Sequence, residues 1–316
     1  MSATLHSSSP TFGGNLSGFE QTVHPMLMLT AKEALSVGVL VVFAVFLVLE
    51  TLFPYRKALF KTLINSYLTN SYTFIFNNII LSSFSLTSLF FIAQNLSHLR
   101  LLSGLSNHLV KWAISFILLD LTVYLWHRAN HTFSCLWRFH KVHHSDNSLN
   151  VSTAIRFHMG ELFLTVWVKS AFIIVVGIEA EVVLVNELVI TLFVVFHHAN
   201  ISFKGEQFLS KLIIVPRLHR THHSARRVEE NSNYGIVFSV WDRAFGTIKE
   251  VVPERVGLRN VRDQNFLELL KFGFTTEPKL LLPQGHIISA PWGSHCEDAL
   301  KLNLRLADRD VSRKVP

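Results

Sequence analysis

Charged residues are scarce in this chain. Asp, Glu, Lys and Arg make up 16% of the 316 residues and hydrophobic residues make up 49%, and the mean hydropathy is +0.34. A composition this apolar excludes an ordinary soluble protein and indicates a membrane protein. Cysteine is almost missing, because Cys135 and Cys296 are the only two. Two isolated cysteines exclude a disulfide framework and a cysteine-based metal site.

Several motifs are also missing. The chain has no glycine-rich dinucleotide fingerprint, no flavin pattern and no cytochrome-b5-like haem domain. It lacks the HExxH motif of zinc proteases and the Glu-x-x-His pairs of soluble di-iron bundles. The net charge is +7, but no RNA- or DNA-reading motif accompanies it, so nucleic acid is not expected as a partner. In a membrane protein these basic residues fit loops beside anionic lipid.

Long apolar runs predict an all-α integral membrane fold. A helix needs about 20 apolar residues to cross the ~30 Å hydrocarbon core. One of the runs contains Asn77 and Asn78, and the last two form a helical hairpin that breaks around Gly177. We predict four to five transmembrane or membrane-embedded helices. The runs are 34–53, 72–93, 109–126, 162–178 and 180–197.

Histidine is abundant, with 17 residues, and it gathers in three clusters, HRANH, HKVHH and HRTHH. Separations of three and four residues place imidazoles on one face of a helix. Grouped imidazoles repel one another when protonated, whereas a bound cation keeps them neutral. Eight imidazoles exceed what one tetrahedral ion can use, so the count predicts two metal ions. The eight are His127, His131, His140, His143, His144, His219, His222 and His223.

The predicted spans bring all three clusters to one side of the membrane. The first cluster follows the 109–126 run directly, and the 162–197 hairpin leaves that side and returns before the third cluster. The loop after the first span is on the same side and carries Arg56, Lys57 and Lys61. Because basic loops mark the cytoplasmic side, we predict a cytosolic helical cap that holds the histidine-rich dimetal site.

The ligand type restricts the metal without deciding it. Imidazole suits iron, copper, zinc and nickel. The chain offers two ions an almost purely nitrogen ligand set and no zinc-protease motif. Metal number and ligand type together favour two irons.

Seven segments occur in a fixed order over roughly residues 110–250: HRANH, LWRFHKVHHSD, RFHMGE, FHHAN, HRTHHS, NYG and WDRAFGT. In this order they resemble the membrane fatty acid hydroxylase/sterol desaturase superfamily. LWRFHKVHHSD and RFHMGE are most similar to its bacterial sterol-desaturase-like branch, which also resembles alkylglycerol monooxygenase. The resemblance implies an O2-dependent oxidase with two non-haem iron ions that acts on a membrane lipid. Since the chain has no redox-cofactor fingerprint, a separate electron donor of the cytochrome b5 or ferredoxin type is expected.

The resemblance also assigns roles residue by residue. The eight clustered histidines match the ligands of the family, and His198 is in register with the histidine of a Phe-x-His-x-Asn motif. His197 is then a structural or orienting residue. His158 matches the histidine of an Arg-x-His-Pro-x-Glu motif in which Met159 replaces proline, so it is either an orienting group or an extra ligand. Beside the nine ligands, the predicted site contains Arg156, His158, Glu161 and Asn200.

Asp120 lies inside the 109–126 run, on one helix stripe with His127 and His131. An acid inside a span usually faces the bundle interior. It could accept a proton from a ligand imidazole or a site water, or it could pair with Lys169 or an Asn of the second span. We favour a role in the polar interior and do not choose between these partners.

Two further motifs, NYG and WDRAFGT, contain Asn233 and Asp242. Their Gly, Asn and Asp residues are typical of turns. We expect them to fold the cap over the metals.

We predict that the protein hydroxylates an unactivated C–H bond of a fatty acyl, alkyl ether or sterol-like lipid. Desaturation by the same site is the alternative, and a membrane zinc hydrolase or a non-catalytic metal transporter or sensor are alternatives of other classes. We divide the chain into a flexible tail (1–30), a catalytic domain (31–250) and a C-terminal cytosolic extension (251–316). The similarity of the motifs to the bacterial branch favours a bacterial inner membrane over the endoplasmic reticulum.

Overall fold

The computed structural model describes residues 36–83, 89–96, 101–102 and 104–275. In these ranges the secondary structure is helical, and the β-structure amounts to two isolated bridges, Ile213 with Phe238 and Ser224 with Val256. The predicted 1–30 tail and the part of the extension beyond 275 lie outside the described residues. The chain forms two units, Met1–Phe274 and Thr275–Pro316, and the first is the one considered below.

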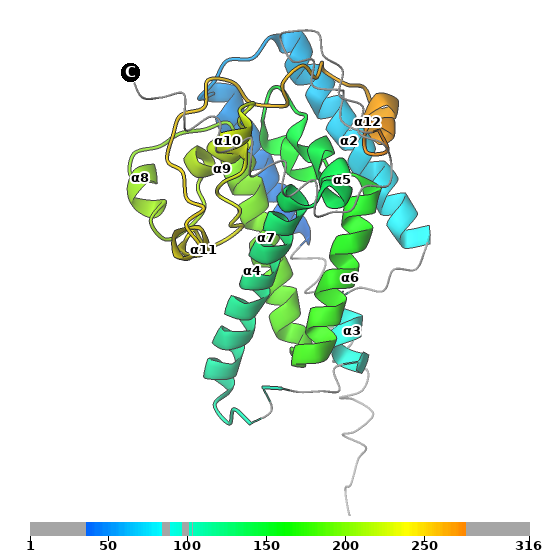
Figure 1. The fold of residues 1–316 in the computed structure, drawn as a ribbon, viewed down its shortest axis with the longest axis vertical. Helices are drawn as coiled ribbons and strands as arrows, with labels where there is room; N and C mark the ends of the chain where they lie inside the picture. The colour runs from blue at the N-terminus through cyan, green and yellow to red at the C-terminus, as the bar shows by residue number, and fades with distance from the viewer. Residues whose placement is uncertain (1–35, 84–88, 97–100, 103, 276–316) are drawn as a thin grey trace, which may run out of the picture. The chain divides into compact units, whose positions relative to one another are not determined.

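Helices α4 (His108–Thr132), α6 (Met159–Val176) and α7 (Ala180–His198) extend below a cap of short helices, and the long helix α2 (Phe60–Ser83) lies at the height of the cap (Figure 1). Three of them are long and apolar enough to cross a membrane by length and composition, namely α4, α6 and α7. The N-terminal helix, Ser36–Leu52, is apolar but shorter. The short helix α3 (Leu89–Leu96) packs against α6 and α7.

The predicted 72–93 run is divided between α2 and α3, and neither helix is among the three candidate spans. The reason is the polar side of α2, which is buried against the rest of the protein instead of facing lipid. The hydroxyl of Ser66 donates to Asp146 at 2.7 Å, and the amide of Asn77 donates to the carbonyl of Phe157 at 2.8 Å. The buried polar residues of α2 are Ser66, Thr69, Asn70, Thr73 and Asn77.

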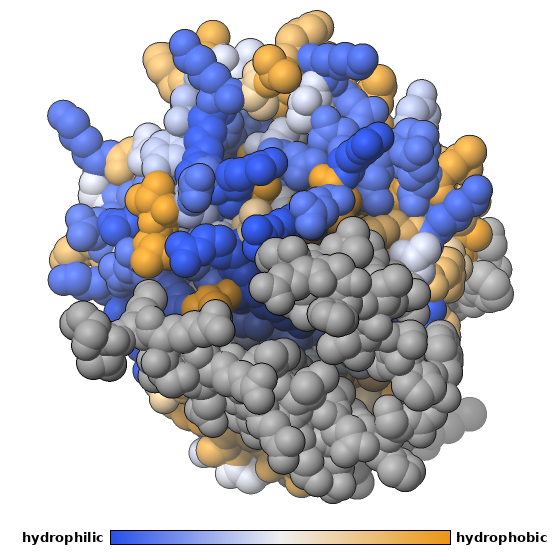
Figure 2. Space-filling model, turned by 45° about the horizontal axis from the view of Figure 1, so that its top comes forward, coloured by the Kyte–Doolittle hydropathy of each residue, from blue (hydrophilic) through white to orange (hydrophobic). Residues whose placement is uncertain are grey.

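The cap consists of short helices joined by loops, at the upper end of α4, α6 and α7 (Figure 1). Turned toward the reader, it is mostly hydrophilic, with a few apolar residues between the polar ones (Figure 2). The cap elements are α5 (Ser134–His144), η1 (Val151–Ile155), α8 (Glu206–Leu209), α9 (Pro216–His222), α10 (Arg227–Glu230), α11 (Val240–Ala244) and α12 (Phe266–Phe272). That the cap is cytosolic stays a prediction.

Helices α6 and α7 form the expected hairpin. Gly177 ends α6 with a left-handed φ of 75°, which glycine adopts at no steric cost. The chain then turns within three residues into α7. Farther along the hairpin, Lys169 pairs with Glu187 at 2.7 Å, so the hypothesis that Lys169 is the partner of Asp120 is wrong.

Residues beyond 250 also pack onto the helical unit. The side chain of Asn265 caps α12 by accepting from the backbone N–H of Glu268 at 3.0 Å. Just before it, the carbonyl of Gln264 accepts hydrogen bonds from Asn65 and Thr69 of α2. These contacts cover the outer side of α2 and α5. The division of the chain at residue 250 stays a prediction.

Candidate metal centre

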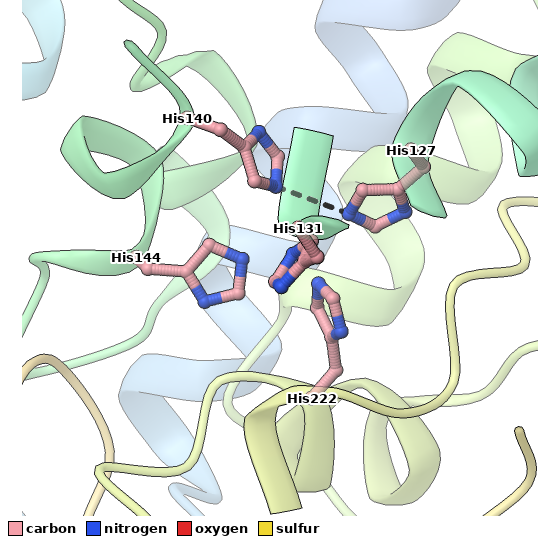
Figure 3. A group of neighbouring side chains, drawn as sticks. All are labelled: His127, His131, His140, His144 and His222. Carbon is pink, nitrogen blue, oxygen red and sulfur yellow. Dashed lines mark hydrogen bonds between the residues drawn. The ribbon is translucent and has the colours of Figure 1, made fainter. Parts of the chain in front are cut away.

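The nine histidines predicted as metal ligands come together where the bundle meets the cap, in two groups. The first group combines residues of α4, α5 and α9, and its imidazoles point toward one another (Figure 3). The second combines residues of α5, α7 and the end of α9. In each group one ring nitrogen per residue lies within 4.8 Å of all the others, and every member is buried. The first group is His127, His131, His140, His144 and His222, and the second is His143, His198, His219 and His223.

Close contacts between Nε2 atoms decide what these groups can bind. In the first group, the Nε2 atoms of His127 and His140 are 3.2 Å apart. In the second group, three such distances are 3.1, 2.9 and 3.1 Å. Two ligands held about 2.1 Å from one ion, at angles of about 90–110°, are ~3.0–3.4 Å apart. The observed spacing therefore matches that of nitrogens around a shared ion.

Hydrogen bonds on the other side of the rings determine which nitrogen faces inward. The Nδ1 atoms of His127 and His222 lie 2.8 and 2.7 Å from the backbone carbonyl oxygens of Tyr234 and Ser232. A carbonyl acceptor requires a protonated Nδ1, which leaves a lone pair on Nε2. Lone pairs that face each other repel unless a cation lies between them. In this tautomer the inward Nε2 atoms cannot hydrogen-bond one another, and they fit a metal.

The same arrangement holds for two more members of the first group. The Nδ1 of His140 is 2.7 Å from Glu161 Oε1, and that of His131 is 3.4 Å from Asn231 Oδ1. The Nδ1 of His144 lies 3.6 Å from a carboxylate oxygen of Glu230, which is beyond hydrogen-bond distance. Three Nε2 atoms of this group are buried and have no hydrogen-bond partner among the described residues. Buried polar atoms are normally satisfied, so these orphaned nitrogens are consistent with metal ligation.

The second group is oriented less completely. The Nδ1 of His143 lies 3.2 Å from the carbonyl oxygen of Arg156, and the Nδ1 of His198 lies 2.7 Å from that of Val194. The Nδ1 atoms of the other two members are buried and without a hydrogen bond in the described part of the chain. The two groups therefore differ in how firmly their rings are held.

The two groups adjoin. The rings of His144 and His223, one from each group, stack with centroids 4.4 Å apart and planes 13° from parallel. Two ions, one in each group, would thus be neighbours. The arrangement fits a dinuclear centre, although the role of each histidine as a ligand stays a prediction.

One short segment orients most of the first group. Residues 230–234 supply the oxygen atoms that face the Nδ1 atoms of four of its five imidazoles, all except His140. Partners of this kind fix the tautomer and orientation of ligand histidines. Residues 230–234 are called the orienting segment below.

The motifs NYG and WDRAFGT hold the orienting segment in place. Asn233 has a left-handed φ of 53°, and its amide donates to the carbonyls of Leu218 and Lys249 at 2.9 and 2.7 Å. The carboxylate of Asp242 accepts from the backbone N–H groups of Tyr234 and Gly235, both at 2.8 Å. The predicted turns therefore position, through these hydrogen bonds, the groups that lie behind the imidazoles.

Burial keeps the cap imidazoles neutral. It lowers the pKa of His143, His144, His219, His222 and His223 well below 6.5, and the neighbouring imidazoles lower it further. Neutral rings are the form that binds metal.

This pKa shift has a sign that can be tested on the metal-free protein. Below about pH 6.5 the unfolded chain takes up protons on these histidines while the folded chain does not, so acid favours unfolding. We expect the thermal midpoint of metal-free protein in detergent to fall steadily as the pH is lowered from 7.5 to 5.5. His223→Gln, which removes one such group, should give a shallower fall. A midpoint that stays constant or rises over this range would contradict the shift.

Residues 112–247 match the model of the fatty acid hydroxylase family. The chain carries a fatty acid hydroxylase domain. It is 30% identical over 143 residues to ornithine lipid hydroxylase OlsE of Rhizobium tropici, with 43% of each chain covered. It is 28% identical over 163 residues to human alkylglycerol monooxygenase (52% of this chain, 36% of that one). It is 26% identical over 159 residues to cholesterol 25-hydroxylase of Rattus norvegicus (47% and 49%).

These alignments span at most about half the length of the relatives they match. No solved structure matches this chain. The relatives therefore support the family, and the geometry of the site comes from this structure alone.

Two of the other predicted site residues lie directly behind imidazoles of the two groups. Glu161, in the first turn of α6, is 5% exposed and holds His140. Arg156 contacts His143 through its backbone carbonyl, while its buried guanidinium donates to the carbonyl of Val142 and to the side chain of Asn70. These contacts place both residues behind imidazoles, and their orienting roles stay predictions.

His158 belongs to neither metal group. Its Nδ1 accepts from the backbone N–H of Gly160 at 3.0 Å, which caps α6, and its Nε2 lies 3.2 Å from the carbonyl of Leu270. The ring stacks on Phe139 with centroids 5.0 Å apart. Because both ring nitrogens are engaged, the structure gives His158 the role of a helix cap and not that of an extra ligand.

The hydrogen-bond partners of Asp120 and Asn200 are not imidazoles. Asp120 accepts from the indole N–H of Trp241 at 2.7 Å and from the backbone of Val237 at 3.4 Å, so it anchors the loop that follows the orienting segment. Asn200 exchanges hydrogen bonds with the backbone of Arg56. Each ties the cap to a bundle helix or its loop. The structure brings neither to an imidazole by a hydrogen bond.

His197 is fully buried beside the second group. Its ring centroid is 3.9 Å from that of His219. It is not among the four residues whose nitrogens converge. This placement agrees with the structural or orienting role predicted for it.

Glu161 offers a direct test of the groups behind the ligands. Glu161→Ala removes the acceptor of His140 and frees that ring to rotate. Such losses typically cost 10–100-fold in metal affinity, and we expect a decrease of about that size in chelator competition. Glu161→Gln keeps an acceptor oxygen and should lose much less. If the alanine variant holds its metal as tightly as the parent protein, Glu161 does not orient His140.

Sequence reasoning did not find the acceptors of the orienting segment. Glu230, Asn231 and Ser232 follow HRTHH by only a few residues, but no spacing rule marks them. They act through tertiary contacts with α4, α5 and α9. The NYG motif beside them was the available signal, because it marks a fixed backbone next to the ligands.

Proposed function

We propose that this protein is an O2-dependent lipid hydroxylase with two non-haem iron ions. The observation that carries the proposal is the pair of adjacent, buried imidazole groups whose Nε2 atoms converge at 2.9–3.2 Å. The fatty acid hydroxylase domain supports it, as do relatives named as hydroxylases or monooxygenases of lipids.

Iron is the metal that we propose for this nitrogen-rich centre. Nine imidazoles, with Glu161 and Glu230 behind two of them, suit a transition metal, and the family is known for its use of iron. Bound iron would supply the oxidising chemistry that inserts one oxygen atom of O2 into a C–H bond. The second oxygen atom leaves as water, which consumes two electrons and two protons from outside. No redox cofactor motif is present in the chain, so the electrons come from a separate donor.

The protein itself orients the imidazoles and keeps bulk water out of the centre. Burial of all nine imidazoles keeps bulk water away from the centre, and the groups behind the rings fix their orientation. Helix α6 starts next to Glu161 and exposes apolar side chains such as Phe163 and Trp167. A lipid held against such helices can present its chain to a centre at their upper end, which favours an acyl, alkyl ether or sterol-like substrate.

The experiment that tests this function is untargeted lipid mass spectrometry of cells with and without the protein. We expect a lipid that gains one oxygen atom, taken from isotopically labelled O2. A lipid that loses two hydrogens without gaining oxygen would identify a desaturase instead. If no lipid changes, the proposed function fails.

Metal analysis separates the proposal from the other classes. Protein purified without oxygen should contain two irons per chain. Stoichiometric zinc with O2-independent activity would identify a hydrolase. A transporter would need ligands along α4, α6 and α7, whereas the two groups gather at one end of these helices, and metal flux in proteoliposomes without lipid oxidation would favour it.

We also propose that the site faces the cytoplasm, as the basic loop after the first span predicts, and that the membrane is a bacterial inner membrane.

A further inference from the structure

We infer that electrons enter the centre through Trp137, beneath a docking surface formed by Arg226 and Arg227 at α10. This inference rests on the proposed function, which requires two electrons for each turnover. It commits to one occupant of the surface, a one-electron carrier protein with an acidic face.

Trp137 lies between the first metal group and the protein surface. Its side chain is 4% exposed, and its ring centroid is 4.9 Å from that of His131, 5.4 Å from that of His144 and 6.0 Å from that of His140. One aromatic side chain therefore contacts three of the five imidazoles. Electron tunnelling weakens steeply with distance, so the place where a single residue separates the ligands from the surface is a favourable entry.

Arg227 covers Trp137 on the outer side. Its guanidinium carbon is 5.6 Å from the centroid of the Trp137 ring, and the residue is exposed. The order from solvent to metal site is thus guanidinium, indole, imidazole. A cation over the face of an aromatic ring is a favourable contact, and it also leaves a positive charge at the surface.

At α10 the arginine residues are exposed, whereas the acidic side chains turn inward. The side chain of Arg226 is 71% exposed, whereas that of its ion-pair partner Glu229 is 13% exposed and that of Glu230 is 5% exposed, beside His144. Positive surfaces steer and orient partners of opposite charge. This complementarity selects an acidic carrier.

Other aromatic side chains also contact the imidazoles. Tyr234, which is 5% exposed, reaches the ring of His131 at 5.1 Å, and Phe157 stacks on His143 with centroids 4.6 Å apart. Among these three aromatic contacts in the described residues, Trp137 is the one whose ring lies under an arginine guanidinium. The Trp137 route therefore joins an aromatic contact with a charged surface residue.

The redox step balances as a one-electron transfer. The reduced carrier would give up one electron and be oxidised, and a ferric ion held by the five imidazoles of the first group would accept that electron. Two such events supply the two electrons of the proposed hydroxylation.

The first part of the test measures docking and needs no bound metal. Cys135 is exposed two residues before Trp137, so a fluorophore on this thiol, in a Cys296→Ser background, reports on the surface. Titration with the soluble domain of cytochrome b5 or a plant-type ferredoxin at low salt should change its emission. We expect Arg227→Glu to weaken this binding about tenfold, as like charges are brought together. Lys204→Glu, a matched reversal of an exposed cap charge, should not weaken it.

The second part measures electron delivery to the iron-loaded protein. Trp137→Leu should slow reduction by the carrier about tenfold while leaving its binding, and reduction by dithionite, unchanged. Trp137→Phe keeps an aromatic ring and should slow it less. If Trp137→Leu loses iron, the reduction rate of Trp137→Phe and the carrier binding of Arg227→Glu still test the inference.

Three outcomes would overturn the inference. The first is that each carrier binds the parent protein and Arg227→Glu equally well. The second is that the Trp137 variants are reduced at the parental rate. The third is that anionic lipid vesicles change the emission while neither carrier does. Failure of the proposed function is distinct, since it would appear as missing iron or unchanged lipids even where a carrier docks at Arg227.

Discussion

Replacing His222 by alanine is expected to abolish lipid oxidation and to remove one of two bound irons. His222 is fully buried, its Nδ1 is held by the carbonyl of Ser232, and its Nε2 has no hydrogen-bond partner among the described residues. It is therefore an oriented donor with one free nitrogen that faces four other imidazoles. Loss of groups behind ligands already costs about 10–100-fold, so loss of a ligand should exceed a hundredfold in activity.

The matched experiment on the second group is His219→Ala. Its Nε2 contacts those of His198 and His223 at 2.9 and 3.1 Å. We expect an equal loss of activity with the other ion removed. His108→Ala is the control, because His108 is exposed at the start of α4 and should retain both irons. Iron content, product formation and membrane insertion are measured together, and turnover at the parental rate in either variant would refute the site.

Gly235→Ala is expected to have the second largest effect. A Cβ at this position would lie 2.5 Å from the backbone carbonyl oxygen of Phe238 and 3.0 Å from a carboxylate oxygen of Asp242. The carbonyl cannot easily retreat, because the adjoining Val237 and Ser239 are bonded to the backbone of Ile214 and Leu212. The orienting segment must shift instead.

That shift would disturb the first metal group and spare the second. Overpacking of this kind costs about 1–3 kcal/mol, and the moved acceptors should release the ion of the first group. We expect iron to fall to about one per chain, a lower thermal midpoint and activity near zero. Gly104→Ala, where a Cβ meets open space, is the control. Two irons and normal stability in Gly235→Ala would show that the orienting segment is not needed.

The sequence predicted the parts of the site that depend on local periodicity. The spacing of HRANH and HKVHH holds within single helices, so the register of His127 with His131 and of His140 with His144 could be predicted without tertiary information. The hairpin that returns His198 to the same end also follows from the lengths of two apolar runs. The structure places these residues as that reasoning requires.

What sequence reasoning missed depends on contacts between distant segments. Asn77 interrupts the apolar 72–93 run, but its amide donates to the backbone carbonyl of Phe157, a contact that sequence alone does not indicate. Asp120 is 121 residues from Trp241, and no pattern links them. His158 carried a family motif, yet its position at the start of α6 gives its nitrogens to the backbone.

The orienting segment has a consequence for how the centre assembles. All nine histidines precede residue 230 in the chain, so during synthesis every one of them emerges before the oxygens that bond three rings of the first group. The second group uses Val194 and Arg156, which emerge early. The acceptors found for the second group are therefore available before those of the orienting segment. An ion held by the first group would reach its final surroundings only after the last part of the cap has folded.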